Sequence, residues 1–356
     1  MIAGTRICSS SPIDRSMPHR VPKTEAELDA LLSIPRPATT AALARAPGDI
    51  VVLGAGGKMG PTLAQMARRA AGDNRRVIAA SRFTSPEAEE SLRDAGVETV
   101  HCDFLDRSAL ARLPDAPNVV FMAGQKFGTT DSPERTWMMN VVVPANCAAR
   151  YPDARIVVFS TGNVYPLVPV ASGGARETDT TGPIGEYASS CLGRERVFEH
   201  YARSYGTRVA IVRLNYAIDL RYGVLVDLAM RILREQPISL RMGYVNVIWQ
   251  RDANAAALEL LPHASSPPLT VNVTGAQVLP VREIARLLGQ RLGKAPLFTD
   301  TEEPDALLSN TARMTEYVGE PEMPLATMLD WIAAWVKTGG KLLGKDTKYE
   351  VRTGEF

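Results

Sequence analysis

A chain of 356 residues can form one large domain or two smaller ones around a substantial core. Its 45% hydrophobic and 22% charged residues are typical of a globular protein, and a net charge of +1 without any Lys/Arg block argues against a nucleic-acid partner. No apolar run approaches the ~20 residues that cross a bilayer, and no signal peptide is recognisable, so we expect a cytoplasmic protein without a membrane partner. The four cysteines and four histidines lack metal-ligand spacing, so we expect no bound metal.

The first segment of the chain is polar and rich in Ser, Pro and Arg up to about residue 22, and we predict that it is disordered. The next segment predicts one or two short helices broken at Pro35 and Pro37. Thr24 and Glu27 have the spacing of a capping box at the start of the first helix.

From Asp49 onward, short apolar runs rich in β-branched residues alternate with helical stretches. The predicted strands are 50–53, 76–80, 97–100, 118–123, 155–160 and 208–214. Buried strands joined by crossover helices form a doubly wound parallel sheet, so we predict an α/β Rossmann fold with a smaller C-terminal α/β substrate-binding lobe. The predicted divisions are an N-terminal extension (1–48), an NAD(P)-binding Rossmann domain (49–214), a substrate lobe interleaved with the end of that domain (215–336) and a basic C-terminal tail (337–356).

The loop after the first predicted strand has the pattern G-x-x-G-x-x-G, formed by Gly54, Gly57 and Gly60. In such loops the first glycine makes the tight turn, the second lets backbone amides approach a pyrophosphate, and the third lets helix and strand pack closely. The helix N-terminus then faces the anion with its positive end. This loop, which also contains Lys58 and Met59, therefore predicts a dinucleotide site.

The end of the second predicted strand indicates which dinucleotide binds. NAD-binding proteins usually carry Asp or Glu there, whereas this chain has Ser81 and Arg82. Arg82 could pair with a 2′-phosphate through charge-assisted hydrogen bonds, and Lys58 could add a second positive charge. We therefore predict NADP as the cofactor, with NAD as the alternative.

Six further segments, in order along residues 50 to 336, resemble the extended short-chain dehydrogenase/reductase family, the NAD(P)-dependent sugar epimerases and dehydratases. They are HCDFLD, FMAGQKFG, WMMNVVVPANCAAR, FSTGNVYP, VRLNYAIDLRYG and VNVTGAQVLPVREIARLLG. The resemblance implies that Thr161 is the catalytic hydroxyl and that Asn215 opens the substrate lobe. It also implies cofactor-site positions for Asp103, Phe104, Ala123, Gly124, Ser160 and the structural asparagine Asn140.

The catalytic Tyr-x-x-x-Lys of this family is altered here, because Tyr187 is followed by Cys191. The family's lysine lowers the pKa of the tyrosine and holds the nicotinamide ribose, and a neutral thiol does neither. We predict Tyr187 as the acid/base, with Lys126, after the fourth strand, as the best candidate for the missing ammonium. A Cys191 thiolate, or a relay through Thr161 without any cation, remains an alternative.

Two arginines further along the same helix, Arg194 and Arg196, are predicted to be surface residues. In the substrate lobe, ISLRMGYVNVIWQRDAN offers Arg241, Gln250 and Arg251 as donors to a polyhydroxylated or phosphorylated ligand.

The resemblance leaves two functions open. One is an NAD(P)-dependent oxidoreductase or epimerase of a sugar or sugar-nucleotide-like substrate, and the other is a catalytically silent NAD(P)-binding sensor or scaffold. Dehydration is disfavoured, because Gly162 and Asn163 stand where the family's dehydratases carry an acidic pair; Asn163 is instead predicted to contact substrate.

The resemblance also implies a homodimer formed through helices at about 133–150 and 186–204. The outward faces predicted for them include Met138, Val142, Phe198 and Tyr201, some of which must cover the sheet.

Overall fold

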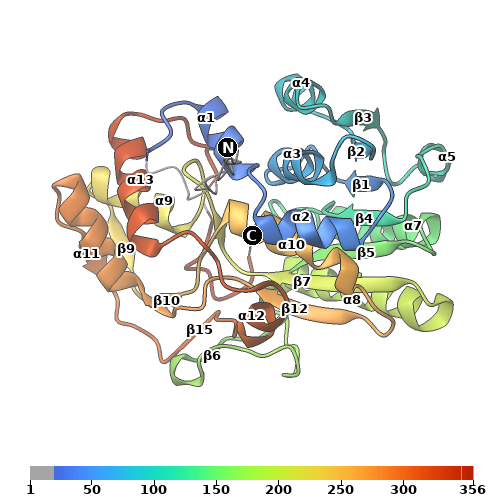
Figure 1. Ribbon diagram of the computed structural model, residues 1–356. Coiled ribbons are helices and arrows are strands. Elements are labelled where there is room, and N and C mark those ends of the chain that lie inside the picture. The colour runs from blue at the N-terminus through green and yellow to red at the C-terminus, as the bar shows by residue number, and fades with distance from the viewer. Residues whose placement is uncertain (1–19, 346, 356) are drawn as a thin grey trace, which may run out of the picture.

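The computed structural model describes residues 20–345 and 347–355, arranged as a Rossmann domain with a second lobe beside it (Figure 1). Most of the segment predicted to be disordered lies outside the described residues. None of the helices in the described ranges combines the length and apolar character needed to cross a membrane.

The centre of the Rossmann domain is a seven-stranded parallel sheet in the order β3-β2-β1-β4-β5-β7-β12. Its strands are β1 Ile50–Leu53, β2 Val77–Ser81, β3 Glu98–His101, β4 Asn118–Phe121, β5 Arg155–Thr161, β7 Arg208–Leu214 and β12 Leu269–Val273. The predicted doubly wound sheet is confirmed. Because the strand order reverses between β1 and β4, the loops that follow these two strands open a crevice at the carboxyl edge of the sheet.

Helices cover both faces of this sheet, because successive strand residues point to opposite sides. One face packs against α2 Pro37–Arg45, α3 Gly60–Ala71 and α10 Gln250–Glu259, and the other against α5 Arg107–Ala111, α7 Val143–Arg150 and α8 Gly185–Tyr205. The edge strand β3 is flanked by α4 Pro86–Asp94. Val51 and Val52, adjacent in β1, belong to the two different cores.

The second lobe has its own apolar core, built on α9 Val224–Leu233, α11 Val281–Leu292 and α13 Leu325–Lys337. Short strand pairs connect these helices: β8 Ala217–Ile218 with β11 Ile248–Trp249, β9 Pro237–Ser239 with β14 Leu297–Thr299, β10 Tyr244–Val245 with β13 Leu279–Pro280, and β6 Val168–Pro169 with β15 Asp305–Ala306. α12 Ala312–Val318 packs beside β12, where the lobe rejoins the Rossmann domain.

The two predicted N-terminal helices are present as α1 Glu25–Leu32 and α2, and their buried leucines belong to different cores, although α1 also contacts α3. Leu28 of α1 is part of the second lobe's core, whereas Leu43 of α2 belongs to the core of the Rossmann domain. The Thr24 hydroxyl accepts a hydrogen bond from the Glu27 amide at 3.1 Å, as a capping residue does.

The C-terminal strap, residues 341–355, follows α13 and contacts several distant segments. The Leu343 amide donates to the carbonyl of Arg221 at 3.1 Å, and Arg352 is paired with Asp305. Tyr349 is buried in the second lobe's core. The strap is therefore anchored along its described length.

The helices predicted to form a dimer interface are α6 Pro133–Trp137, the π-helical turn Met138–Val142 and α7 on one side, and α8 on the other. Met138 and Val142 are exposed, as predicted. Phe198 is one of those that cover the sheet: it is fully buried, with its ring centroid 5.4 Å from that of Phe121 beneath the sheet.

Candidate active site

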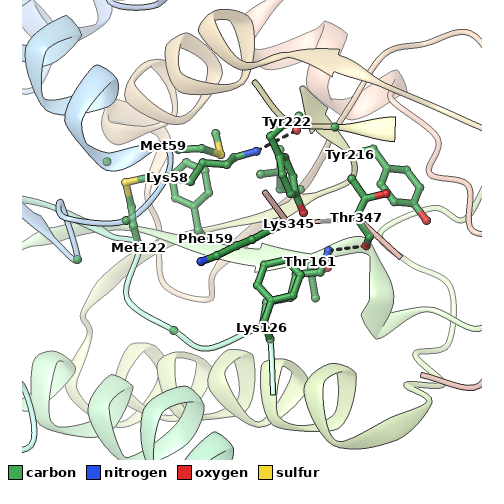
Figure 2. Close-up of a pocket in the computed structure, with 18 of the residues that line it drawn as sticks. Lys58, Met59, Met122, Lys126, Phe159, Thr161, Tyr216, Tyr222, Lys345 and Thr347 are labelled. Carbon is green, nitrogen blue, oxygen red and sulfur yellow. Dashed lines mark hydrogen bonds between the residues drawn. The ribbon is translucent and has the colours of Figure 1, made fainter. Parts of the chain in front are cut away.

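A cavity of about 690 Å³ opens at the carboxyl edge of the sheet, where β1, β4, β5 and β7 end (Figure 2). Its walls come from the glycine loop, the loops after β4, β5 and β7, the start of α8, and the C-terminal strap. Most of the predicted site residues line it: Gly54, Gly57, Lys58, Met59, Gly60, Gly124, Lys126, Ser160, Thr161, Asn163, Tyr187 and Asn215.

The glycine loop forms one wall of this cavity and requires its glycines. Gly54 has φ +91°, and a Cβ there would lie 2.6 Å from the amide nitrogen of Ala123. A Cβ on Gly60 would collide with the backbone of Ala55. The bare backbone before α3 is therefore a cradle for an anion, and these residues fit the pyrophosphate of a dinucleotide.

Thr161, at the end of β5, and Tyr187, in the first turn of α8, are hydrogen-bonded to each other inside the cavity. The Thr161 oxygen also accepts hydrogen bonds from the Asn163 backbone amide at 3.2 Å and side-chain amide at 3.1 Å. Because a hydroxyl has two acceptor lone pairs and one proton, Asn163 leaves the Thr161 proton to be donated to Tyr187. Asn163 therefore orients the predicted catalytic hydroxyl.

The pKa of Tyr187 is raised above the ordinary tyrosine value, first by burial and then by the neighbouring Cys191. Arg194 and the hydrogen bond from Thr161 oppose this rise. Burial also raises the pKa of Cys191, so the thiol stays neutral at ordinary pH. A Cys191 thiolate base, one of the three alternatives, is therefore disfavoured.

Lys126 and Lys58 reach into the cavity from opposite sides (Figure 2). The Lys126 ammonium donates to the carbonyl of Thr347 at 3.4 Å, and burial lowers the pKa of Lys126 to about 8. The Lys58 ammonium lies 3.8 Å from the centroid of the Tyr222 ring, and burial lowers the pKa of Lys58 to about 8 as well. The positive charge of Lys126 also lowers the pKa of Lys58, so the protonation of Lys58 depends on the charge of Lys126.

The position of Lys58 corrects one expectation. Its ammonium donates to the carbonyl of Ala217 at 3.3 Å, so it points across the cavity to the second lobe and not toward Arg82. The reason is that Lys58 lies near the start of α3, where the loop turns toward the β7–β8 connection.

Behind the cavity, Ser160 joins a buried ionic network. Its hydroxyl donates to Glu195 at 2.5 Å, and Glu195 forms a 2.7 Å salt bridge with Arg213. All three side chains are buried, and the pair holds the end of β5 against α8 and β7.

Three predicted substrate residues lie outside the cavity, and we no longer assign them to substrate binding. Arg241 is exposed beside Glu303, Gln250 donates to Thr62 of α3 at 3.1 Å, and Arg251 forms a 2.7 Å salt bridge with Glu322. α10 is buried between α2 and α3, so its polar residues hold helices together.

The remaining predicted cofactor residues are not part of the cavity lining. Ser81 lies next to Gly56, Arg82 and Asp103 are exposed, Phe104 is buried, and Ala123 packs against Gly54. Their contacts with a cofactor stay predictions.

Asn140 is fully buried, and its amide bonds to Gln125, Ser190 and Arg194. These contacts give it a structural role, and we withdraw the expectation of a direct cofactor contact.

Arg194 corrects a further expectation, because it is not a surface residue. Only 6% of it is exposed, whereas Arg196 is exposed as predicted. The sequence pattern missed this because the burial of Arg194 depends on partners from two other segments.

Several lining residues were not predicted from the sequence. They are Gly56, Ser85, Met122, Phe127, Phe159, Leu214, Tyr216, Ala217, Tyr222, Gly223, Val224, Leu343, Lys345 and Thr347. The last three come from the C-terminal strap, for which the only signal was a basic composition. Tyr216 has φ +42°, an uncommon conformation for a non-glycine residue, at the edge of the cavity.

Several solved structures share the fold. The UDP-glucose 4-epimerase of Thermus thermophilus in complex with NAD is 18% identical, with a TM-score of 0.69 over 81% of this chain and 99% of that one. The UDP-glucose 4-epimerase of Thermotoga maritima with UDP-glucose is 18% identical, with a TM-score of 0.67 over 82% and 99%. A UDP-glucuronic acid 4-epimerase variant from Bacillus cereus, with NAD and a fluorinated UDP-glucuronic acid, is 15% identical, with a TM-score of 0.68 over 82% and 99%.

At these identities the likeness concerns the fold alone, and no curated protein sequence matches the chain. The sequence model of the NAD dependent epimerase/dehydratase family matches residues 50–236, which is more than half of the chain. The chain therefore belongs to the NAD dependent epimerase/dehydratase family.

Proposed function

We propose that this protein is an NAD(P)-dependent oxidoreductase or epimerase that transfers a hydride at a carbinol carbon of a sugar or sugar-nucleotide-like substrate. The observation that carries the proposal is the hydrogen bond between Thr161 and Tyr187 inside a cavity whose other wall is the glycine loop. This arrangement brings an acid–base pair and a dinucleotide cradle to one space, as hydride transfer to or from a carbinol requires.

The glycine loop would hold the pyrophosphate of the cofactor at the start of α3, and the nicotinamide, when bound, supplies or accepts the hydride. Gly124, after β4, and Ser160, near the end of β5, also line the cavity. The exposed Arg82, at the end of β2, favours NADP over NAD because its guanidinium could bind a 2′-phosphate.

Tyr187 would exchange a proton with the reacting oxygen, while Thr161 donates a hydrogen bond at the same point. Lys126 would provide the cavity ammonium that binds hydroxyl groups of the ligand, one of the two tasks of the missing motif lysine. With a pKa of about 8, Lys126 is mostly protonated at neutral pH and able to donate.

The cavity lining supports a ligand with both a sugar ring and a negative charge. Phe127, Tyr216 and Tyr222 offer aromatic faces, and Lys58 and Lys345 add positive charge. The sugar nucleotides in the similar structures, UDP-glucose and a fluorinated UDP-glucuronic acid, combine these features, so UDP-sugars are the first substrates to test.

Calorimetric titration with NADP and NAD comes first, followed by incubation with UDP-glucose, UDP-galactose and UDP-glucuronic acid. An epimerase produces the isomeric sugar, detected by NMR, without net cofactor reduction, whereas a dehydrogenase produces reduced cofactor in proportion to product. We expect Tyr187→Phe to lower turnover by roughly 10²–10⁴-fold, the range for losing acid–base assistance. If the unmutated protein binds the cofactor but converts none of these sugars, and so behaves like Tyr187→Phe, the proposal is contradicted.

A further inference from the structure

We infer that Arg194 compensates for the cysteine at position 191: it is a positioning residue that places a fixed positive charge behind Tyr187 and Gly124. The inference rests on the proposed function, because it concerns the same acid–base site. Lys126 and Arg194 would then divide the two tasks of the family's motif lysine, with Lys126 binding the ligand and Arg194 acting on the tyrosine.

The helix geometry makes this possible. Residues three and four apart lie on one face of a helix, so Tyr187, Cys191 and Arg194 follow each other along one face of α8. Long side chains in a helix lean back toward its N-terminus, so the side chain of Arg194 extends over the turn that contains Cys191. Cys191 itself is short and buried, and packs with Val164, Tyr165 and Ala175.

The contacts of the guanidinium fix its place. One Nη donates to the carbonyl of Phe159 at 2.7 Å, and the other donates to the side-chain oxygen of Asn140 at 2.8 Å. The same Nη lies so close to Gly124 that a Cβ at that position would collide with it. Gly124 lines the cavity and Phe159 lies two residues before Thr161, so Arg194 stands directly behind the reacting site.

The charge of Arg194 is not neutralised by a carboxylate within the described part of the chain. Its hydrogen bonds go to neutral oxygens, and its buried Nε has no hydrogen-bond partner among the described residues. The adjacent Glu195 is already bound to Arg213 and Ser160. Since a guanidinium is always protonated, a permanent and largely uncompensated charge lies under the active site.

Electrostatics agrees with this geometry. Burial raises the pKa of Tyr187 and of Cys191, and Arg194 is the foremost group opposing the rise in both. The other charged groups that influence this point are Glu195 of α8 and Lys126, both of which act on Cys191.

The test compares charge with hydrogen bonding at position 194. Arg194→Gln keeps amide donors but loses the charge, Arg194→Lys keeps the charge, and Arg196→Gln removes an exposed arginine from the same helix as the matched control. Each is prepared with a polyfluorinated tyrosine in place of tyrosine, because several electron-withdrawing fluorines lower the phenol pKa by several pH units and so offset the rise that burial causes at Tyr187. The signal missing from Tyr187→Phe then identifies Tyr187 in a ¹⁹F NMR pH titration.

We expect the pKa of Tyr187 to rise by about one pH unit or more in Arg194→Gln, and to stay unchanged in Arg194→Lys and Arg196→Gln. An unchanged pKa in Arg194→Gln overturns the inference. Should Arg194→Gln not fold, Arg194→Met takes its place as the variant without charge, and an unchanged Tyr187 pKa in Arg194→Met likewise overturns the inference.

The NMR titration of Tyr187 needs no substrate turnover, so it tests the role of Arg194 even if the proposed function is wrong. If a substrate is turned over, the rising limb of kcat against pH should move to higher pH in Arg194→Gln alone. Adding Cys191→Lys to Arg194→Gln should move it back, because an ammonium then occupies the motif position.

Discussion

We expect Lys58 and Lys126 to make ligand binding depend on pH. A lysine attracts an anion only while protonated, and burial lowers the pKa of both to about 8. We expect the affinity for a UDP-sugar to be constant below this pH and to weaken as the pH rises through about 8, measured by calorimetry. Lys58→Met and Lys126→Met should flatten the profile, whereas Lys341→Met, which removes an exposed lysine paired with Glu25, should leave it unchanged. A profile identical in all three variants would contradict this assignment.

We expect Arg82 to decide whether NADP or NAD binds. Replacing it with aspartate should weaken NADP binding by roughly 1.5–3 kcal/mol, the value of a charged hydrogen bond, and should leave NAD binding intact. Arg76→Asp is the control, since Arg76 lies just before the opposite end of β2, paired with Glu98. Equal calorimetric affinities for NADP and NAD in the unmutated protein would refute the preference.

Residues tied to a local backbone pattern could be predicted from the sequence. Gly54 and Thr161 are examples, because a glycine loop after a strand and a hydroxyl at a strand end depend on a few neighbouring positions. Arg194 could not, because its burial depends on Phe159 and Asn140, which only the folded chain brings together. Lys58 was placed in the right loop, but the direction of a long, flexible side chain is not encoded in that loop alone.

At the scale of elements, the C-terminal strap is hydrogen-bonded to α9. The Thr347 amide and hydroxyl donate to Asp227 at 2.9 and 2.5 Å, while the Thr347 carbonyl accepts from Lys126. Thr347→Val keeps the shape and removes the hydroxyl bond, so we expect a loss of about 1.5–3 kcal/mol in the free energy of unfolding, because the acceptor is charged. Urea unfolding measures the loss.

The same variant should raise the KM for substrate more than it lowers kcat, because the strap forms a wall of the cavity and is separate from the Thr161–Tyr187 pair. Thr338→Val is the control: its hydroxyl bonds to Ala334 within the preceding helix end, away from the cavity. A KM that is equal in both variants would remove the strap from ligand binding.

Elements with a strong periodic pattern were predictable, and irregular ones were not. Strands β1, β2, β4, β5 and β7 are largely apolar runs, so their positions, and that of the more polar β3 beside them, could be predicted within two residues. The strap has no such pattern, and its course depends on anchors such as Asp227 and Asp305 in other segments. β12 was missed as a sheet strand because it returns from the second lobe after a long excursion.

At the scale of the whole molecule, the two lobes are connected by the main chain after β7 and also by contacts of the N-terminal helices. α1 packs on the second lobe while α2 packs on α10, where Arg36 forms a buried salt bridge with Glu259 at 2.5 Å. The described part of the N-terminal extension therefore contacts both lobes.

The last prediction concerns assembly. Trp137, Met138 and Val142 are exposed on the segment that leads into α7, next to α8, and form the apolar surface expected at a dimer interface. We expect a homodimer at micromolar concentration by light scattering, and a monomer for the double variant Met138→Glu and Val142→Glu, because charges on both copies would then be buried against each other. Leu297→Glu, at an exposed leucine of the second lobe, should remain dimeric. A monomeric unmutated protein would contradict the prediction. Because Phe198 is buried in the core and cannot contribute to an interface, that result would mean that the exposed residues of this segment are too few to hold two copies together.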